Sequence, residues 1–242
     1  MIEAAINKIL RLARPEILHL AEGLRYTNQK LYPVPDPMPS HLDVETLTGL
    51  LDYIQANRDM LSLRDCMIII EDFKTVRLVG SLQGAFLQRP VYMIAECRRD
   101  SLPFGNYMDI EAFIIWLQAS FLDAGDRAKI LAIVGNIQDG QIANFTDDGV
   151  TQSVNVKTGI TKVEVAPVPN PVTLTPYRTF IDAVQPASSF VFRLRSGSGS
   201  ERPKAALFEA DGGKWETDCI LNVRTYLEVE LQALGLEIPV IA

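Results

Sequence analysis

The arginines of one predicted strand are the residues in this sequence best suited to chemistry. Arg193 and Arg195 alternate with Phe192 and Leu194. Side chains of a strand point to opposite faces with a period of two, so the arginines share one face and the apolar pair shares the other. Each guanidinium presents a planar fork of N–H donors, which suits a phosphate or a carboxylate. The pattern therefore predicts an anion-binding face.

Further arginines extend this candidate site. We expect Arg178, which follows an aromatic residue, to lie near the arginine strand in the fold. An alternative interpretation is a solvated sheet face whose arginines pair with acidic residues such as Glu209 across a hairpin. The candidate anion-binding residues are Arg98, Arg99, Tyr177, Arg178, Arg193 and Arg195.

Histidine and glycine motifs for catalysis are not found. His19 and His41 are the only histidines, whereas a zinc site needs about three or four convergent ligands. Neither histidine lies near a GxSxG nucleophile motif. The sequence contains no P-loop and no GxGxxG after a predicted strand. We therefore expect no catalytic residues, no cofactor and no metal, and favour a protein that is not an enzyme.

Acidic pairs offer one weaker route to catalysis. Glu71-Asp72, and Glu209 with Asp211, stand at the ends of predicted strands, where carboxylates could hold Mg²⁺ for nuclease chemistry. A lysine at the usual short spacing within the same strand is missing. A metal-dependent nuclease is therefore the least favoured function.

Composition excludes several classes of protein. The net charge of -7 disfavours a general DNA coat, because phosphate contacts dominate the affinity of such proteins. No apolar run approaches the ~18 residues that span a bilayer, so we expect no membrane. The first residues lack a secretory signal pattern, so we expect a cytoplasmic protein. Cys66, Cys97 and Cys219 are widely spaced, which predicts buried, inert thiols.

Hydrophobic periodicity predicts the elements that position these residues. We expect helices over 2–13 and 44–60, helices that start at Asp109 and at Gly125-Asp126, and a closing helix over 217–234. The apolar face of the first helix continues through 17–24, and Asp43 is the expected N-cap of the second helix. Strands are expected over 66–71, 75–82, 91–98, 143–146, 150–156, 160–166, 189–195 and 204–210.

Strands cluster between helices instead of alternating singly with them, which favours an α+β fold of antiparallel sheets with flanking helices. The N-terminal helical segment and a proline-rich connector occupy residues 1–40, and a single α+β domain occupies 41–242. The sequence pattern changes near 137–145, so an alternative is that the domain is divided there.

Four segments resemble a known group of sequences. They are Pro176–Phe180, Gln185–Arg195, Ala206–Trp215 and Asp147–Gln152. Together they resemble a family of uncharacterised phage and prophage proteins and, more loosely, the YfdQ-like prophage proteins of enteric bacteria. The resemblance implies a phage or prophage origin and expression inside a bacterial host cell. It supplies no catalytic residues.

These observations favour a phage-encoded, non-enzymatic accessory protein that binds an anionic, nucleotide-like ligand and sequesters a host defence signal. An alternative is a scaffold for recombination, replication or single-strand binding. The bases of its nucleic acid would stack on four aromatic residues: Tyr177, Phe180, Phe190 and Phe192. The negative net charge disfavours nucleic acid. A further alternative is a virion or assembly component. We also expect a homo-oligomer, because the apolar faces over 2–24 exceed what a short terminal segment buries.

Overall fold

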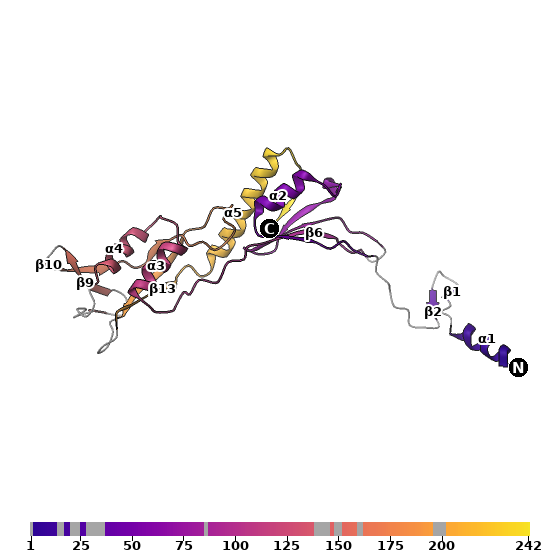
Figure 1. The fold of residues 1–242 in the computed structure, drawn as a ribbon, viewed down its shortest axis with the longest axis horizontal. Helices are drawn as coiled ribbons and strands as arrows, with labels where there is room; N and C mark the ends of the chain where they lie inside the picture. Colours follow the sequence, from indigo (N-terminus) through magenta and orange to yellow (C-terminus); the bar gives the residue numbers. More distant parts are fainter. Residues whose placement is uncertain are drawn as a thin grey trace. The chain divides into compact units, whose positions relative to one another are not determined.

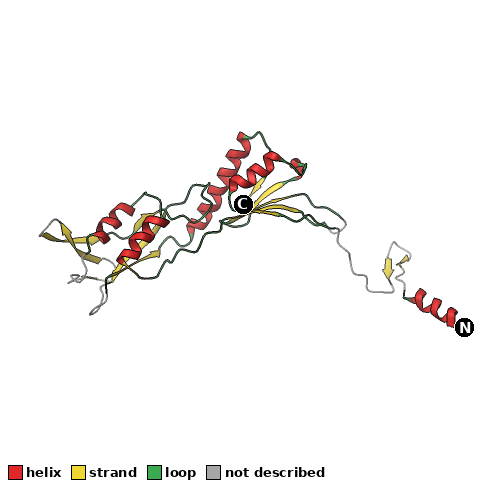
Figure 2. Ribbon diagram, in the orientation of Figure 1, coloured by secondary structure: helices red, strands yellow, loops and turns green. Residues whose placement is uncertain are grey.

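The computed structural model describes residues 2–13, 17–19, 25–27, 37–84, 87–137, 146–147, 152–158, 162–195 and 202–242 (Figure 1). Helices accompany mostly antiparallel sheets, which confirms the predicted α+β class (Figure 2). The chain divides into two units. The smaller comprises Met1–Met38 with Gln83–Gln88, and the larger comprises Pro39–Leu82 with Arg89–Ala242.

The smaller unit contains one helix and one short hairpin. Helix α1 spans Ile2–Leu12 as predicted. Strands β1 (Ile17–His19) and β2 (Arg25–Thr27) pair antiparallel. The expected continuation of the helical face through 17–24 is therefore wrong at Ile17–His19, and 20–24 lie outside the described residues. Pro15 explains the change, because proline has no N–H to continue a helix.

A five-stranded sheet forms one half of the larger unit, in the order β14-β4-β5-β6-β3. The three central strands are those the sequence predicted, and they pair antiparallel. The two edge strands, which were not predicted, pair parallel to their neighbours. The bounds are β3 Leu42–Val44, β4 Met67–Ile70, β5 Thr75–Val79, β6 Val91–Glu96 and β14 Val240–Ile241.

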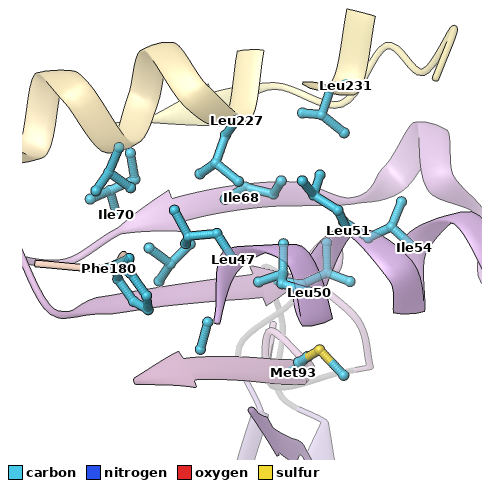
Figure 3. Packing of buried hydrophobic residues seen from close by; sticks show 14 of the residues in the cluster. Leu47, Leu50, Leu51, Ile54, Ile68, Ile70, Met93, Phe180, Leu227 and Leu231 are labelled. Atoms are coloured by element: carbon cyan, nitrogen blue, oxygen red, sulfur yellow. The ribbon is translucent and has the colours of Figure 1, made fainter. Parts of the chain in front are cut away.

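Helices α2 (Leu47–Ala56) and α5 (Lys214–Ala233) cover this sheet, and a 3-10 turn, η2 (Leu63–Asp65), precedes β4. Their apolar stripes meet the inward side chains of the strands in one buried cluster (Figure 3). Burial of each large side chain contributes roughly 1.5–3 kcal/mol. The helical contributors are Leu47, Leu50, Leu51, Ile54, Val223, Leu227 and Leu231.

A four-stranded antiparallel sheet forms the other half, in the order β11-β12-β13-β7. Helices α3 (Ile110–Ser120) and α4 (Arg127–Gly135) pack on it around a second cluster rich in phenylalanine. Asp109 is the N-cap of α3 as predicted, since its Oδ1 accepts a hydrogen bond of 2.9 Å from Ala112 N–H. The bounds are β7 Met108–Asp109, β11 Val172–Leu174, β12 Ser188–Arg195 and β13 Lys204–Glu209.

Three further strands make a separate antiparallel sheet in the order β10-β9-β8. They are β8 Thr146–Asp147, β9 Gln152–Thr158 and β10 Lys162–Val168. The strands predicted near 150–156 and 160–166 are thus present with shifted ends, whereas 143–145 lie outside the described residues.

The N-terminus of α2 is fixed in part by a residue 135 positions later in the sequence than Leu47. Asp43 is not the N-cap, because it lies within β3; Thr46 has that role and accepts from Gly49 N–H at 3.1 Å. Asp182 adds three bonds, from Leu47 N–H (3.2 Å), Thr48 N–H (3.4 Å) and Thr48 Oγ1 (2.6 Å). A carboxylate at this position satisfies free N–H groups and complements the helix dipole.

We expect Asp182→Ala to lower the free energy of unfolding by about 1–2 kcal/mol, the usual loss when a helix N-terminus loses a side-chain acceptor. Asp182→Asn, which keeps one acceptor oxygen, should lose less. Urea unfolding measures both. Asp52→Ala, an exposed change on α2, should stay within about 0.5 kcal/mol of the parent. Equal stability of Asp182→Ala and Asp52→Ala would contradict the capping role.

Candidate ligand-binding cavity

The loop between β11 and β12 is organised by one buried amide. Gln185 Oε1 accepts from the N–H groups of Arg178 (2.8 Å) and Thr179 (3.2 Å). Its Nε2 donates to the carbonyl oxygens of Phe180 (2.8 Å) and Ala183 (3.1 Å). Four backbone groups are thus satisfied by one side chain instead of by a sheet or helix. The position of Arg178 is fixed by this arrangement.

The Arg178 side chain is buried, with 5% of its surface exposed. Its Nη1 donates to Ser188 Oγ at 3.0 Å, and its Nη2 forms an ion pair with Glu209 Oε1. Burial lowers the pKa of Arg178 from its usual value, and the Glu209 carboxylate opposes that shift. Arginine nevertheless keeps its charge at neutral pH, so a permanent cation is held inside the protein.

Three aromatic rings surround the same guanidinium. Its central carbon lies 4.1 Å from the ring centroid of Trp215, 4.9 Å from that of Phe104 and 5.4 Å from that of Phe190. Cation–π contacts of this kind contribute roughly 0.5–2 kcal/mol each. The rings come from α5, from the segment before β7 and from β12, so the cation draws separate elements together.

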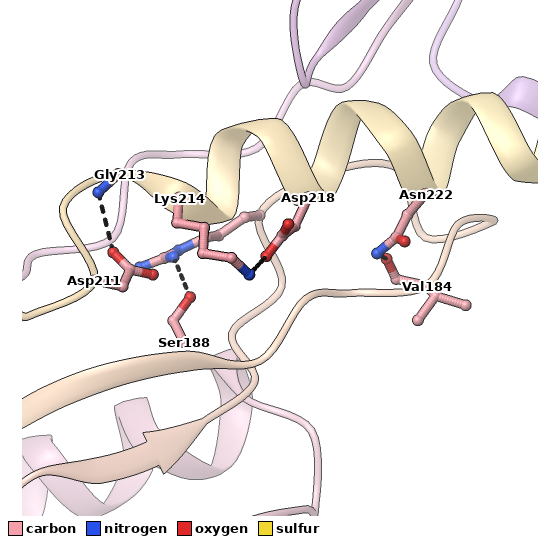
Figure 4. A network of polar contacts seen from close by, with 8 residues as sticks. Val184, Ser188, Asp211, Gly213, Lys214, Asp218 and Asn222 are labelled. Atoms are coloured by element: carbon pink, nitrogen blue, oxygen red, sulfur yellow. Dashed lines mark hydrogen bonds and ion pairs between the residues drawn. The ribbon is translucent and has the colours of Figure 1, made fainter.

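Contacts at the start of α5, the helix that carries Trp215, hold its first turn in place (Figure 4). Gly213 has a left-handed backbone, φ +83°, that favours glycine, and its N–H donates to Asp211 Oδ1 at 3.2 Å. Lys214 Nζ then pairs with Asp218 Oδ2 at 2.7 Å, one turn along the helix. These contacts fix the first turn of α5 and hence the Trp215 ring.

A cavity of about 240 Å³ opens beside Arg178. Aromatic rings form much of its wall, and charges of both signs reach it. The lining residues are Phe73, Lys74, Asp100, Ser101, Leu102, Phe104, Tyr177, Arg178, Glu209, Trp215 and Glu216. We call this space the Arg178 cavity.

Lys74, which lines the Arg178 cavity, and Arg99, which lies against its Tyr177 wall, have no acidic partner among the described residues. Lys74 Nζ donates to the carbonyl oxygen of Arg99 at 2.9 Å, and the Arg99 guanidinium lies 5.4 Å from the Tyr177 ring centroid. Within the described ranges, neither side chain forms an ion pair, whereas Arg178 is neutralised by Glu209. The positive charge available to a ligand is therefore that of Lys74 and Arg99.

Of the six predicted site residues, Tyr177 and Arg178 line the Arg178 cavity, and Arg99 contacts the Tyr177 ring without lining the cavity. Arg98 does not line the Arg178 cavity; it is exposed and pairs with Glu45 (3.5 Å) and Glu96 (3.4 Å).

Arg193 and Arg195 lie elsewhere. The predicted alternation along β12 is confirmed, since Phe192 and Leu194 are buried and the arginines take the other face. Arg178, however, reaches Ser188 on the inward face, roughly 17 Å along the strand from Arg193 at about 3.3 Å per residue. Arg178 therefore contacts the arginine strand, as expected, but at its first residue and on the opposite face from Arg193 and Arg195, so the three arginines do not form one site.

Glu209, the example given in the alternative interpretation, is not the residue opposite these arginines. Across the hairpin, Arg193 is opposite Ala206, and Glu209 is opposite Phe190. Glu209 instead forms an ion pair with Arg178, which lies on the loop between β11 and β12. Arg193 has interactions of its own, and the Arg195 guanidinium lies 4.1 Å from the ring centroid of Tyr107.

Sequence reasoning missed Lys74, Phe104 and Trp215 as site residues. Lys74 stands between the strands predicted over 66–71 and 75–82, and Trp215 follows Gly212-Gly213 at the start of α5. No local spacing joins them, because hairpin and helix meet only through the tertiary fold. An aromatic or a cation in a tight turn was the one available signal.

The cysteines are buried as predicted. Burial raises the pKa of the Cys66 and Cys97 thiols, and it raises the pKa of Cys219 to about 12. A thiol with a raised pKa carries little thiolate at neutral pH, so none of the three is an activated nucleophile.

No cluster of three or more histidine, cysteine or acidic side chains able to hold a metal is found in the described part of the chain. Among the helices described, none is long and apolar enough to cross a membrane.

Comparison of the chain with protein-family models, curated proteins and solved structures found no match.

Removal of the Glu209 carboxylate should destabilise the protein. We expect Glu209→Ala to lower the free energy of unfolding by about 3 kcal/mol, because it leaves the buried Arg178 cation without its counter-charge. Glu209→Gln keeps an acceptor oxygen and should lose less.

The matched control is Glu216→Ala, an exposed carboxylate of the same cavity, which should change stability by no more than about 0.5 kcal/mol. Denaturant unfolding compares the three variants. If Glu209→Ala unfolds like Glu216→Ala, the ion pair does not stabilise the fold.

Proposed function

We propose that this chain is a non-enzymatic accessory protein, of phage or prophage origin, that binds an anionic, nucleotide-like small molecule in the Arg178 cavity. The observation that carries the proposal is an aromatic-walled cavity lined by Lys74, with Arg99 against its Tyr177 wall; neither cation has an acidic partner in the described ranges. By holding such a ligand, the protein would lower the free concentration of a host signal in the bacterial cytoplasm.

The walls suit a flat ring. Phe73, Phe104, Tyr177 and Trp215 all contribute to the lining. Contact between a nucleobase and an aromatic side chain is worth roughly 1–3 kcal/mol, and it tolerates any base because every base has a π-face. The aromatic lining therefore supports a ring-containing ligand over a purely aliphatic one.

The charges suit one anionic group. Lys74 has donors left after its bond to the Arg99 carbonyl oxygen. The first turn of α5, with Trp215 and Glu216, forms part of the wall, and a helix N-terminus carries about half a positive charge. Both features favour a phosphate or a carboxylate on the ligand.

The volume limits the ligand. At about 240 Å³, the Arg178 cavity falls below the ~300–1,000 Å³ typical of sites for drug-sized molecules. A mononucleotide or a smaller molecule is supported, with its phosphate at the mouth. A cyclic dinucleotide would leave much of its surface outside.

Binding is favoured over catalysis by the state of the lining groups. Glu209 is occupied by Arg178, and the pKa of the nearby Cys219 thiol is raised to about 12. Glu209 is therefore not a free general base and Cys219 is not an activated nucleophile; the carboxylates of the lining without such a partner are Asp100 and Glu216.

Tryptophan fluorescence tests the proposal. Trp215 lines the Arg178 cavity, whereas Trp116 packs in the other core, so Trp116→Phe leaves a single reporter. We expect AMP to change its emission saturably. Lys74→Ala should weaken binding by about 10- to 100-fold, because a charge-assisted hydrogen bond is worth ~1.5–3 kcal/mol.

The matched control is Arg64→Ala, which removes an exposed positive charge from η2, outside the lining. It should leave the affinity within about twofold of the parent, because surface charges beyond a Debye length of about 8 Å are largely screened. Absence of a saturable response to AMP, GMP, CMP and UMP alike, or unchanged affinity in Lys74→Ala, would overturn the proposal.

We also propose self-association through α1, which would suit an assembly component as well. Ile2, Ile6 and Ile9 recur on one face of this helix. Symmetric association of two copies is the commonest way to bury such a face.

Light scattering tests this second proposal. The parent should have the mass of an oligomer, and Ile6→Glu/Ile9→Glu should have the mass of a monomer, because a charge on the apolar face cannot be buried unpaired. Asn7→Glu, on the opposite face of α1, should remain an oligomer. A monomeric parent would disprove the proposal.

A further inference from the structure

We propose that the Arg178 cavity selects ligands whose ring bears an exocyclic amino group, such as adenine or cytosine, and discriminates against uracil-type rings. This inference rests on the proposed function and adds the chemical class of the ring. The selecting groups are the carboxylates of Asp100 and Glu216.

These two carboxylates are the acidic groups of the lining that remain available. The third, Glu209, is held by Arg178. Asp100 and Glu216 are exposed, and neither has a side-chain hydrogen bond or an ion pair with any described residue. Two acceptors therefore face solvent at the Arg178 cavity, beside the available cations Lys74 and Arg99.

The chemistry of a carboxylate decides what it can select. An ionised Asp or Glu accepts hydrogen bonds and cannot donate. A ring edge beside it must therefore present donors. Adenine presents its N6 amino group and cytosine its N4 amino group, whereas thymine, and uracil with the same carbonyl, presents the O4 acceptor. An acceptor beside a carboxylate is repelled, because neither group supplies a hydrogen to the other.

The balance of available charge supports the same class. Of the available lining groups, Lys74 is one cation against the two carboxylates of Asp100 and Glu216, and the sum reaches zero only when Arg99, which lies outside the lining against Tyr177, is included. A ligand with anionic groups alone would satisfy the cations and leave both carboxylates opposed by like charge. A ligand with one phosphate and an amino-bearing ring satisfies both sets, which is how a site of mixed sign gains specificity.

Two matched pairs of ligands test the inference in the Trp116→Phe protein. CMP and UMP have nearly equal size and differ at ring positions 3 and 4, where cytosine has an unprotonated N3 and an amino group and uracil has an N3–H and a carbonyl. AMP and purine riboside 5′-monophosphate differ only by the amino group. We expect CMP and AMP to bind at least about tenfold more tightly than their partners, since one base-reading contact discriminates by roughly 1–3 kcal/mol.

The residue assignment is tested with Asp100→Asn/Glu216→Gln. An amide both donates and accepts, so the CMP-to-UMP affinity ratio should fall towards one in this variant. Asp52→Asn, an exposed change on α2, should keep the parental ratio. An unchanged ratio in Asp100→Asn/Glu216→Gln would overturn the assignment to these residues.

The outcomes separate this inference from the proposed function. If CMP and UMP bind the parent equally, the selection of amino-bearing rings is wrong and the proposed function stands. If no mononucleotide binds, the proposed function fails and this inference fails with it. Tighter binding of CMP that is lost in Asp100→Asn/Glu216→Gln supports both.

Discussion

The burial of one cation is the constraint on which the arrangement of the larger unit depends. A buried charge loses several kcal/mol of hydration, and only close counter-charges, hydrogen bonds and aromatic faces offset that loss. Arg178 obtains them from Ser188 on β12, Glu209 on β13 and Trp215 on α5. None of these elements can shift without leaving the guanidinium unsatisfied. The geometry of the Arg178 cavity follows from this constraint, because the same groups form its wall.

The loop that carries Arg178 also connects the two hydrophobic clusters. Its Asp182 binds the N-terminus of α2, and its Thr179 Oγ1 donates to the carbonyl oxygen of Phe73 in the β4–β5 turn. Phe180 is buried in the first cluster, whereas β12, which follows the loop, contributes Phe190 to the second. Gln185 holds the loop in one conformation. The cavity therefore lies where hydrogen bonds and buried side chains of both clusters meet.

Local pattern predicted those features that depend on neighbours in sequence. The alternation of Phe192 to Arg195, the cap at Asp109 and the helical periods of α2 and α5 each arise within a few residues. The location of Arg178 could not be predicted, because its partners follow it by 10 to 37 positions and its face is fixed by tertiary packing.

The same limit applies to the short edge strands and to one helix cap. β3 and β14 have three and two residues, too few for a period to be visible. Asp43 resembled a cap by residue type, yet pairing of β3 with β6 placed it in a strand, and Thr46 took the role.

The length of α5 has a consequence for how the protein responds to an occupied cavity. This helix has 20 residues, or about 30 Å at 1.5 Å per residue, and its first turn forms part of the cavity wall. Its later turns supply Val223, Leu227 and Leu231 to the first core. Helix formation is cooperative, so fraying at the first turn is coupled to the turns beyond it. A ligand that holds the first turn of α5 in place would slow hydrogen exchange at backbone amides in later turns of the helix, which the ligand does not touch.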